Sequence, residues 1–76
     1  MSTSLTIPRL EMSMTEGILA EWLVPDGQDV QVGDPIYTLE TEKAAQEIES
    51  PAAGRLVHKL PAGATYDVGV EIGEIL

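Results

Sequence analysis

Short apolar runs alternate with proline and glycine along most of the chain. Runs of this length that are rich in Ile, Val, Leu and Tyr and bounded by turn residues are typical of β-strands. The expected strands cover residues 5–7, 17–24, 29–30, 36–41, 45–50, 55–60, 66–68 and 71–76. Residues 9–16 show no clear period of two, and Gly17 would cut short any helix there, so we expect a loop. The pattern predicts an all-β sandwich or flattened β-barrel.

The two central runs are joined by a few polar or small residues. One run ends at Leu39 and the next restarts around Ala45, and a connection of this length suits a β-hairpin. Lys43 would therefore lie at the hairpin tip, directly after Glu42. A solvated turn lysine that softens the local acidity is the simplest interpretation of Lys43 alone.

An internal repeat strengthens the hypothesis that Lys43 has a function. Turn and core-type residues recur at a nearly constant spacing: Ser13, Gly17, Leu19 and Leu23 match Ser50, Gly54, Leu56 and Leu60, and Pro25, Gly27, Val32, Gly33 and Ile36 match Pro61, Gly63, Val68, Gly69 and Ile72. Two such halves are expected to pack about a pseudo-two-fold axis, each burying the other's apolar face. The hairpin would join the halves and project Lys43 from one end, while the termini leave from the other. A tethered unit with a lysine at its far end has the shape of a carrier.

Charge and composition exclude several function classes. A chain of 76 residues makes one small domain, and its net charge of −9 removes the main source of affinity for nucleic acid. With no cysteine, the chain has no disulfide, thiol nucleophile or thiolate metal site of its own. Neither a signal peptide nor an apolar run of membrane-spanning length is visible. We therefore expect a cytoplasmic protein that binds neither nucleic acid nor membrane.

Other residues are weaker candidates for a catalytic or binding site. His58, the only histidine, lies in a strand pattern without a glycine-framed serine, and we expect it to be structural or merely exposed. Glu40 and Glu42 would share one face of a strand, where a small filled sandwich would not desolvate them enough for acid–base catalysis. The acids do not follow a calcium-loop spacing, so no metal site is predicted. Met12 and Met14 could serve either packing or an adaptable contact surface.

Several motifs together resemble those of lipoyl domains, the swinging-arm carriers of 2-oxo acid dehydrogenase complexes. They are Pro8-Arg9-Leu10, Met14-Thr15-Glu16-Gly17, Trp22, Asp26-Gly27, Val32-Gly33-Asp34-Pro35, Glu40-Thr41-Glu42-Lys43-Ala44, Ser50-Pro51-Ala52-Ala53-Gly54 and Val68-Gly69. The resemblance implies one lipoyl (biotinyl/lipoyl-attachment) domain over residues 1–76, with two four-stranded antiparallel sheets and internal pseudo-two-fold symmetry. It also implies that Lys43, flanked by Glu42 and Ala44, carries lipoic acid in amide linkage. The chain would be non-catalytic by itself and would form the N-terminal part of a dihydrolipoamide acyltransferase.

The same resemblance implies the partners. A lipoate ligase or lipoyl transferase would load the arm, and a thiamine-dependent 2-oxo acid decarboxylase, an acyltransferase core and dihydrolipoamide dehydrogenase would use it. Partner recognition is expected from the loop residues Leu10, Glu11, Met12, Ser13, Met14, Thr15 and Glu16. Two positions depart from the family pattern, because Glu11 stands where glycine is usual and Glu42 where aspartate is usual. Two alternatives stay open: a biotinyl carrier domain of a carboxylase, whose lysine lies between methionines, and an unmodified interaction module.

Overall fold

A computed structural model describes residues 2–76, which form eight β-strands and no helix. The strands are β1 (Thr3–Thr6), β2 (Glu16–Trp22), β3 (Asp29–Val30), β4 (Pro35–Glu40), β5 (Ala45–Glu49), β6 (Gly54–His58), β7 (Ala64–Asp67) and β8 (Glu71–Ile75). Every strand expected from the sequence is present, and no strand end lies more than two residues from its predicted place. Proline and glycine between the apolar runs therefore located the turns correctly.

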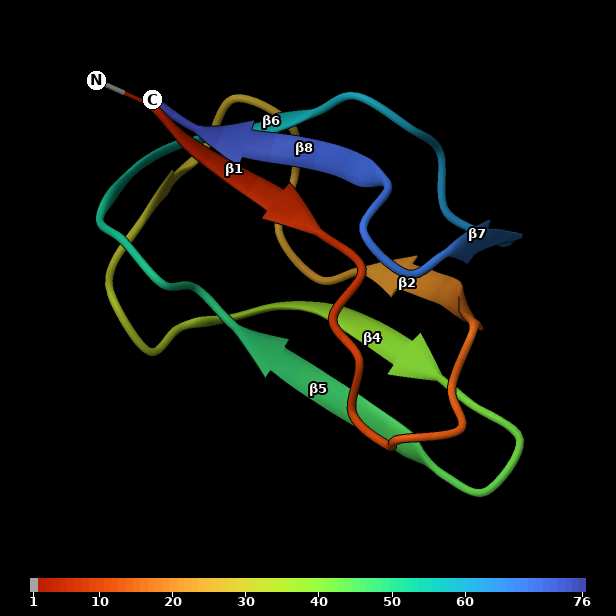
Figure 1. Cartoon of the computed structure of the whole chain (residues 1–76). Helices are drawn as coiled ribbons and strands as arrows, with labels where there is room; N and C mark the ends of the chain where they lie inside the picture. The colour runs from red at the N-terminus through yellow and green to blue at the C-terminus, as the bar shows by residue number, and fades with distance from the viewer. Residues whose placement is uncertain (1) are drawn as a thin grey trace.

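The strands build two four-stranded antiparallel sheets, with the orders β1-β8-β6-β3 and β5-β4-β2-β7. Figure 1 shows them as two layers, with β1 and β8 in one and β4 and β5 in the other. Each sheet keeps two edge strands, so the layers form a flattened sandwich rather than a closed barrel. This confirms the predicted all-β architecture. Residues 2–76 contain no helix that is long and apolar enough to cross a membrane.

The predicted internal symmetry is present in the sheet orders. Replacing β1 to β4 by β5 to β8, and the reverse, converts one order into the other. The turns repeat as well, because Gly27 and Gly63 have φ angles of 86° and 88°, and Gly33 and Gly69 have φ angles of 93° and 92°. Side chains other than glycine rarely adopt this left-handed conformation. The repeated glycines thus place the same two turns in each half.

Aliphatic side chains from the two layers meet in one core. Equivalent positions of the halves contribute equally, since Leu19 and Leu56, and likewise Ile36 and Ile72, are fully buried. The remaining buried hydrophobic residues are Leu5, Ile7, Met14, Val30, Tyr37, Leu39 and Ile75. Each half therefore covers the apolar face of the other, as the repeat predicted.

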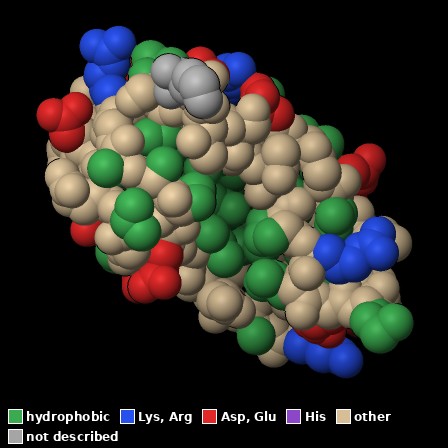
Figure 2. All heavy atoms as spheres, turned by 60° about the vertical axis from the view of Figure 1, so that its left-hand side comes forward, with side chains coloured by type: hydrophobic (Ala, Val, Ile, Leu, Met, Phe, Trp, Pro, Cys, Tyr) green, Lys and Arg blue, Asp and Glu red, His purple; other side chains and the backbone are tan. Residues whose placement is uncertain are grey.

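A shallow groove remains open between the edge strands β1 and β5. Its volume is about 230 Å³, and its lining includes Leu5, Tyr37, Ile48 and Pro51. On the face shown in Figure 2, hydrophobic side chains gather in a central hollow. None of the residues 41–44 lines this groove, so it is separate from the hairpin tip.

The molecule is elongated, with principal extents of 32 × 20 × 20 Å. In Figure 1 the connection between β4 and β5 lies at one end, and the start of β1 and the end of β8 lie side by side at the other. The pairing of Thr3 with Ile75 holds these two strand ends together. The hairpin tip therefore lies at the opposite end of the molecule from the start of β1 and the end of β8, in agreement with the arrangement inferred from the repeat.

Candidate functional site

Lys43 lies in the connection between Glu40 and Ala45, the last paired residues of the β4–β5 hairpin. Thr41 closes this connection, because its N–H donates to the Ala44 carbonyl oxygen over 2.8 Å and its hydroxyl accepts from the Ala44 N–H over 3.3 Å. Threonine commonly forms such local bonds at turns. The closed turn projects Lys43, whose side chain is 75% exposed. Lys43 is thus at the tip, as predicted.

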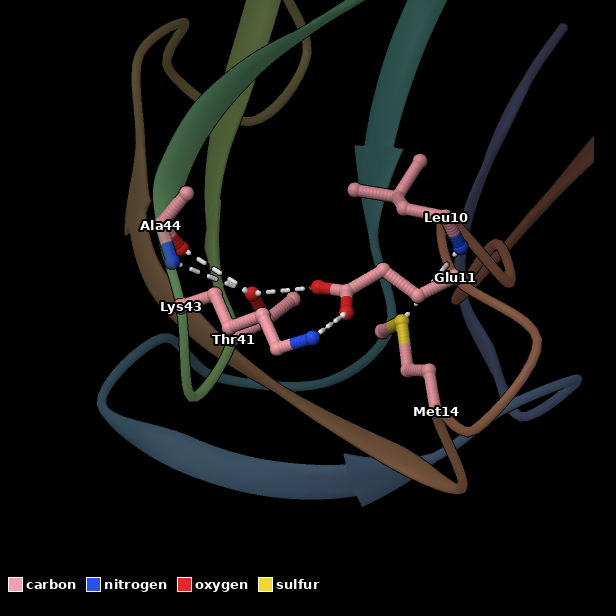
Figure 3. A network of polar contacts seen from close by, with 6 residues as sticks. All are labelled: Leu10, Glu11, Met14, Thr41, Lys43 and Ala44. Atoms are coloured by element: carbon pink, nitrogen blue, oxygen red, sulfur yellow. Dashed lines mark hydrogen bonds and ion pairs between the residues drawn. The ribbon is translucent and has the colours of Figure 1, made fainter.

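A loop from the start of the chain packs against the tip (Figure 3). The two carboxylate oxygens of Glu11 face different groups: Oε2 lies 3.6 Å from Lys43 Nζ, and Oε1 lies 3.4 Å from the Thr41 hydroxyl oxygen. The loop has its own bonds, since the Met14 N–H donates to the Glu11 carbonyl oxygen over 3.1 Å and the Leu10 N–H donates to Met14 Sδ over 3.4 Å. Glu11 is therefore a bridge between the loop and the tip.

A pocket of about 240 Å³ opens where the loop meets the tip. It is lined by Glu11, Ser13, Met14, Thr15, Glu16, Gly17, Ile18, Glu40, Thr41, Glu42, Lys43 and Thr65. Five of the seven residues expected to serve partner recognition are in this lining, together with Lys43. The tertiary structure thus brings the loop and the lysine into one site.

The loop residues differ in exposure. Leu10 is 39% exposed and Met12 is 96% exposed, so both present apolar surface to solvent next to the tip. Met14 is only 7% exposed and belongs to the core. Of the two roles expected for Met14, the structure shows packing, because its side chain is buried and its Sδ accepts from the Leu10 N–H. Its part in partner recognition stays a prediction. Met12 keeps the character of an adaptable contact.

The acids at the tip do not form the expected strand pair. Glu40 is the last residue of β4, whereas Glu42 lies beyond the strand in the turn. The prediction that they share one strand face was wrong, because β4 ends at Glu40, one residue before the predicted end at Thr41. Both side chains are exposed, and the tip is a solvated acidic surface.

Lys59 is held in a different environment from Lys43. It follows β6 directly, so the prediction that it lies inside a strand was wrong. Its Nζ lies 2.7 Å from Glu71 Oε2 and 3.8 Å from Glu74 Oε2. The hydrogen bond between Lys59 and Glu71 raises the pKa of the Lys59 ammonium and lowers the pKa of the Glu71 carboxyl. Lys59 is therefore paired with two carboxylates of β8.

His58 has a structural environment. Its ring stacks on the Trp22 indole with the centroids 4.1 Å apart, and its Nε2 lies 2.8 Å from the Val24 carbonyl oxygen. Its backbone N–H donates to Asp26 Oδ1 over 2.8 Å. Of the two alternatives stated for His58, the structural one holds. Across residues 2–76, no three His, Cys, Asp or Glu side chains are grouped in a way that could hold a metal ion.

Sequence reasoning missed Thr41 as the residue that both closes the turn and contacts Glu11. The signal was a threonine at the start of a short connection, where its hydroxyl can replace a backbone partner. It also missed the pairing of Glu11 with Lys43. Opposite charges at positions 11 and 43 were visible, but nothing local indicated that they would meet.

Comparisons with known proteins point to one family. The biotin/lipoyl family model, described as "Biotin-requiring enzyme", matches residues 3–75. Across its whole length, the chain is 38% identical to the dihydrolipoyllysine-residue acetyltransferase component of the pyruvate dehydrogenase complex of Zymomonas mobilis. It is 39% identical, over 97% of its length, to the protein of the same description from Corynebacterium glutamicum. It is 33% identical, over 99% of its length, to the dihydrolipoyllysine-residue succinyltransferase component of the 2-oxoglutarate dehydrogenase complex of Bartonella vinsonii.

The chain spans only a small part of each relative. The matched region is 17% of the Zymomonas protein, 11% of the Corynebacterium protein and 18% of the Bartonella protein. The similarity thus concerns one domain, and the family match covers nearly all of this chain. With the two symmetric sheets and the lysine at the hairpin tip, these matches show that the chain belongs to the biotin/lipoyl family of carrier domains.

Proposed function

We propose that the chain is a lipoyl carrier domain and that Lys43 Nζ is the attachment point for lipoic acid. The observation that carries the proposal is the position of Lys43, 75% exposed at a hairpin tip and at the opposite end of the molecule from the start of β1 and the end of β8. The three relatives described above are all named as dihydrolipoyllysine-residue components, which favours lipoate over biotin as the attached group.

The residues present fit such an attachment. An amide bond between Lys43 Nζ and a carboxyl group needs an accessible amine, and the Thr41 bonds hold the turn that presents it. When bound, a lipoyl group would supply the dithiolane that a chain without cysteine lacks, and with it the transfer of acyl groups and reducing equivalents. The contribution of this chain is position. A rigid tip on a tethered domain replaces a diffusing reactant by one at high effective concentration.

The partners follow from this role. A lipoate ligase or lipoyl transferase would recognise the unmodified tip. A thiamine-dependent 2-oxo acid decarboxylase, an acyltransferase core and dihydrolipoamide dehydrogenase would meet the loaded tip in turn. The relatives are named as components of such dehydrogenase complexes. We place the domain in the cytoplasm, in the N-terminal region of a dihydrolipoamide acyltransferase.

The test is modification of the parent chain and of Lys43→Arg in cells supplied with lipoate. We expect lipoate on Lys43 in the parent, found by intact mass and peptide mapping, and none in the variant. Lys59→Arg is the matched control and should be modified like the parent, because Lys59 Nζ is paired with the carboxylates of Glu71 and Glu74. Lipoate on Lys59 would contradict the assignment. A biotin adduct would indicate a biotinyl carrier, and a parent without any adduct would indicate an unmodified interaction module.

A further inference from the structure

The unmodified Lys43 is held by a carboxylate from a distant part of the chain. Glu11 Oε2 lies 3.6 Å from Lys43 Nζ, and the Glu11 side chain is 32% exposed. The other carboxylate oxygen, Oε1, lies 3.4 Å from the Thr41 hydroxyl oxygen. That hydroxyl also lies 3.2 Å from the Ala44 carbonyl oxygen, so its single proton is shared between two acceptors. Lys43 is therefore the stronger of the two groups that attract Glu11 to the tip.

The surroundings of Glu11 are otherwise acidic. Four carboxylates line the pocket between the loop and the tip: those of Glu11, Glu16, Glu40 and Glu42. Lys43 is the one cationic residue in this lining. The lysine therefore offsets repulsion among the acids as well as attracting Glu11 directly.

Acylation of Lys43 changes this balance, because an amide nitrogen carries no charge. We propose that acylation releases Glu11 from the tip and loosens residues 9–15, so that the loop reports the modification state of the carrier. This inference rests on the proposed function for the identity of the acyl group. The ligase, which needs the free amine, meets the closed loop. The enzymes that use the loaded arm meet an open loop whose freed Glu11 carboxylate suits a basic partner surface.

The expected effect is local. Exposed ion pairs contribute little to stability, so loss of this pair should increase opening of the loop by about two- to five-fold. The Met14 amide is the reporter, because it donates to the Glu11 carbonyl oxygen inside the loop. Its hydrogen exchange, measured by NMR, follows local opening without requiring global unfolding.

The experiment compares the parent chain with Lys43→Gln, Glu11→Gln and the double variant. Glutamine at position 43 copies the neutral amide of an acylated lysine and needs no ligase. We expect Lys43→Gln to speed exchange of the Met14 amide about two- to five-fold in the parent background, and to have no effect when Glu11 is already glutamine. Lys43→Arg, which keeps the charge, should exchange like the parent. Lys59→Gln, which removes a cation elsewhere, should do the same.

Two results would overturn the proposal: equal exchange in the parent and Lys43→Gln, or an equal acceleration in the Glu11→Gln background. The lipoylated parent should match Lys43→Gln. If intact mass shows no lipoate on Lys43, the proposed function fails, and the comparison of the glutamine variants still decides whether the loop senses the charge of residue 43.

Discussion

At the scale of single residues, Tyr37 links protonation to folding. It is 1% exposed and packs edge-on against Trp22, with the ring centroids 5.6 Å apart. Burial raises the pKa of its phenol from 10.0 to about 12. Below pH 10 the phenol is protonated in both the folded and the unfolded chain, so its contribution to stability is complete. Between pH 10 and 12 only the unfolded phenol ionises, and stability is lost.

We therefore predict that Tyr37→Phe weakens the alkaline loss of stability. Between pH 9 and 12 the parent should lose about 2 kcal/mol more unfolding free energy than the variant. Urea unfolding followed by Trp22 fluorescence at each pH measures this difference. The internal control is the range below pH 9, where the parent and Tyr37→Phe should have parallel stability curves, because the Tyr37 phenol is protonated in both the folded and the unfolded chain there. Parallel curves for the parent and Tyr37→Phe between pH 9 and 12 would refute the prediction.

The residues beside Lys43 carry a second prediction. Glu42 and Ala44 present a charge and open space to a ligase, whereas methionines would present apolar, flexible contacts. Replacing both by methionine should lower lipoylation below the parent level and admit some biotin. The fold should be unchanged, because both positions are exposed. The measurement is the modified fraction by mass after expression with each ligase. If lipoylation is unchanged and no biotin is incorporated, the residues beside Lys43 do not distinguish the two ligases. The loop of residues 10–16 would then be the next candidate.

At the scale of elements, Gly73 shows how closely the central strand β8 is packed. β8 pairs with β1 and β6, and Gly73 lies opposite Leu5 and His58. A Cβ atom at residue 73 would lie 2.5 Å from the Val57 carbonyl oxygen and 3.2 Å from Trp22 Cη2. The first of these is backbone of a paired strand, so it cannot move aside without disturbing the sheet.

Gly73→Ala should therefore destabilise the domain by about 1–3 kcal/mol, the usual cost of added volume in a packed region. Chemical denaturation at neutral pH measures the change. Glu74→Ala, next on the same strand, adds no volume to the sheet and removes the 3.8 Å contact with Lys59, so its cost should stay below about 1 kcal/mol. A Gly73→Ala variant as stable as its Glu74→Ala control would show that β8 can shift to make room.

At the scale of the whole molecule, the core and the attachment site are physically separate. The core is built from the two halves, whereas Lys43 lies at one end and contacts Glu11 only at the surface. A group attached to Lys43 should therefore add little that distinguishes the folded from the unfolded chain.

The prediction is that the chain folds without its attached group. Thermal unfolding midpoints of the unmodified and lipoylated forms should agree within about 4 °C, which leaves room for the loss of one exposed ion pair. Circular dichroism of both forms, with modification checked by mass, provides the comparison. Midpoints that differ by many degrees would mean that the arm packs on the protein instead of moving freely.

Local pattern in the sequence was sufficient for most of the architecture. Turns depend on glycine and proline within a few residues, so the eight strands and the tip around Lys43 were predictable. The symmetry was predictable too, because two copies of one backbone need the same glycines, as the matching φ angles of Gly27 and Gly63 show.

Only the tertiary structure decided which distant residues meet. The approach of Glu11 to Lys43, the burial of Met14 and the stacking of His58 on Trp22 join segments far apart in the sequence. The early end of β6 could not be predicted from the local sequence either. It follows from a contact with a distant strand, because the N–H groups of Lys59 and Leu60 both donate to the Ile72 carbonyl oxygen. Periodicity describes which side of a strand a residue occupies. It does not encode which other strand or loop covers that side, because that choice is made by packing across the whole molecule.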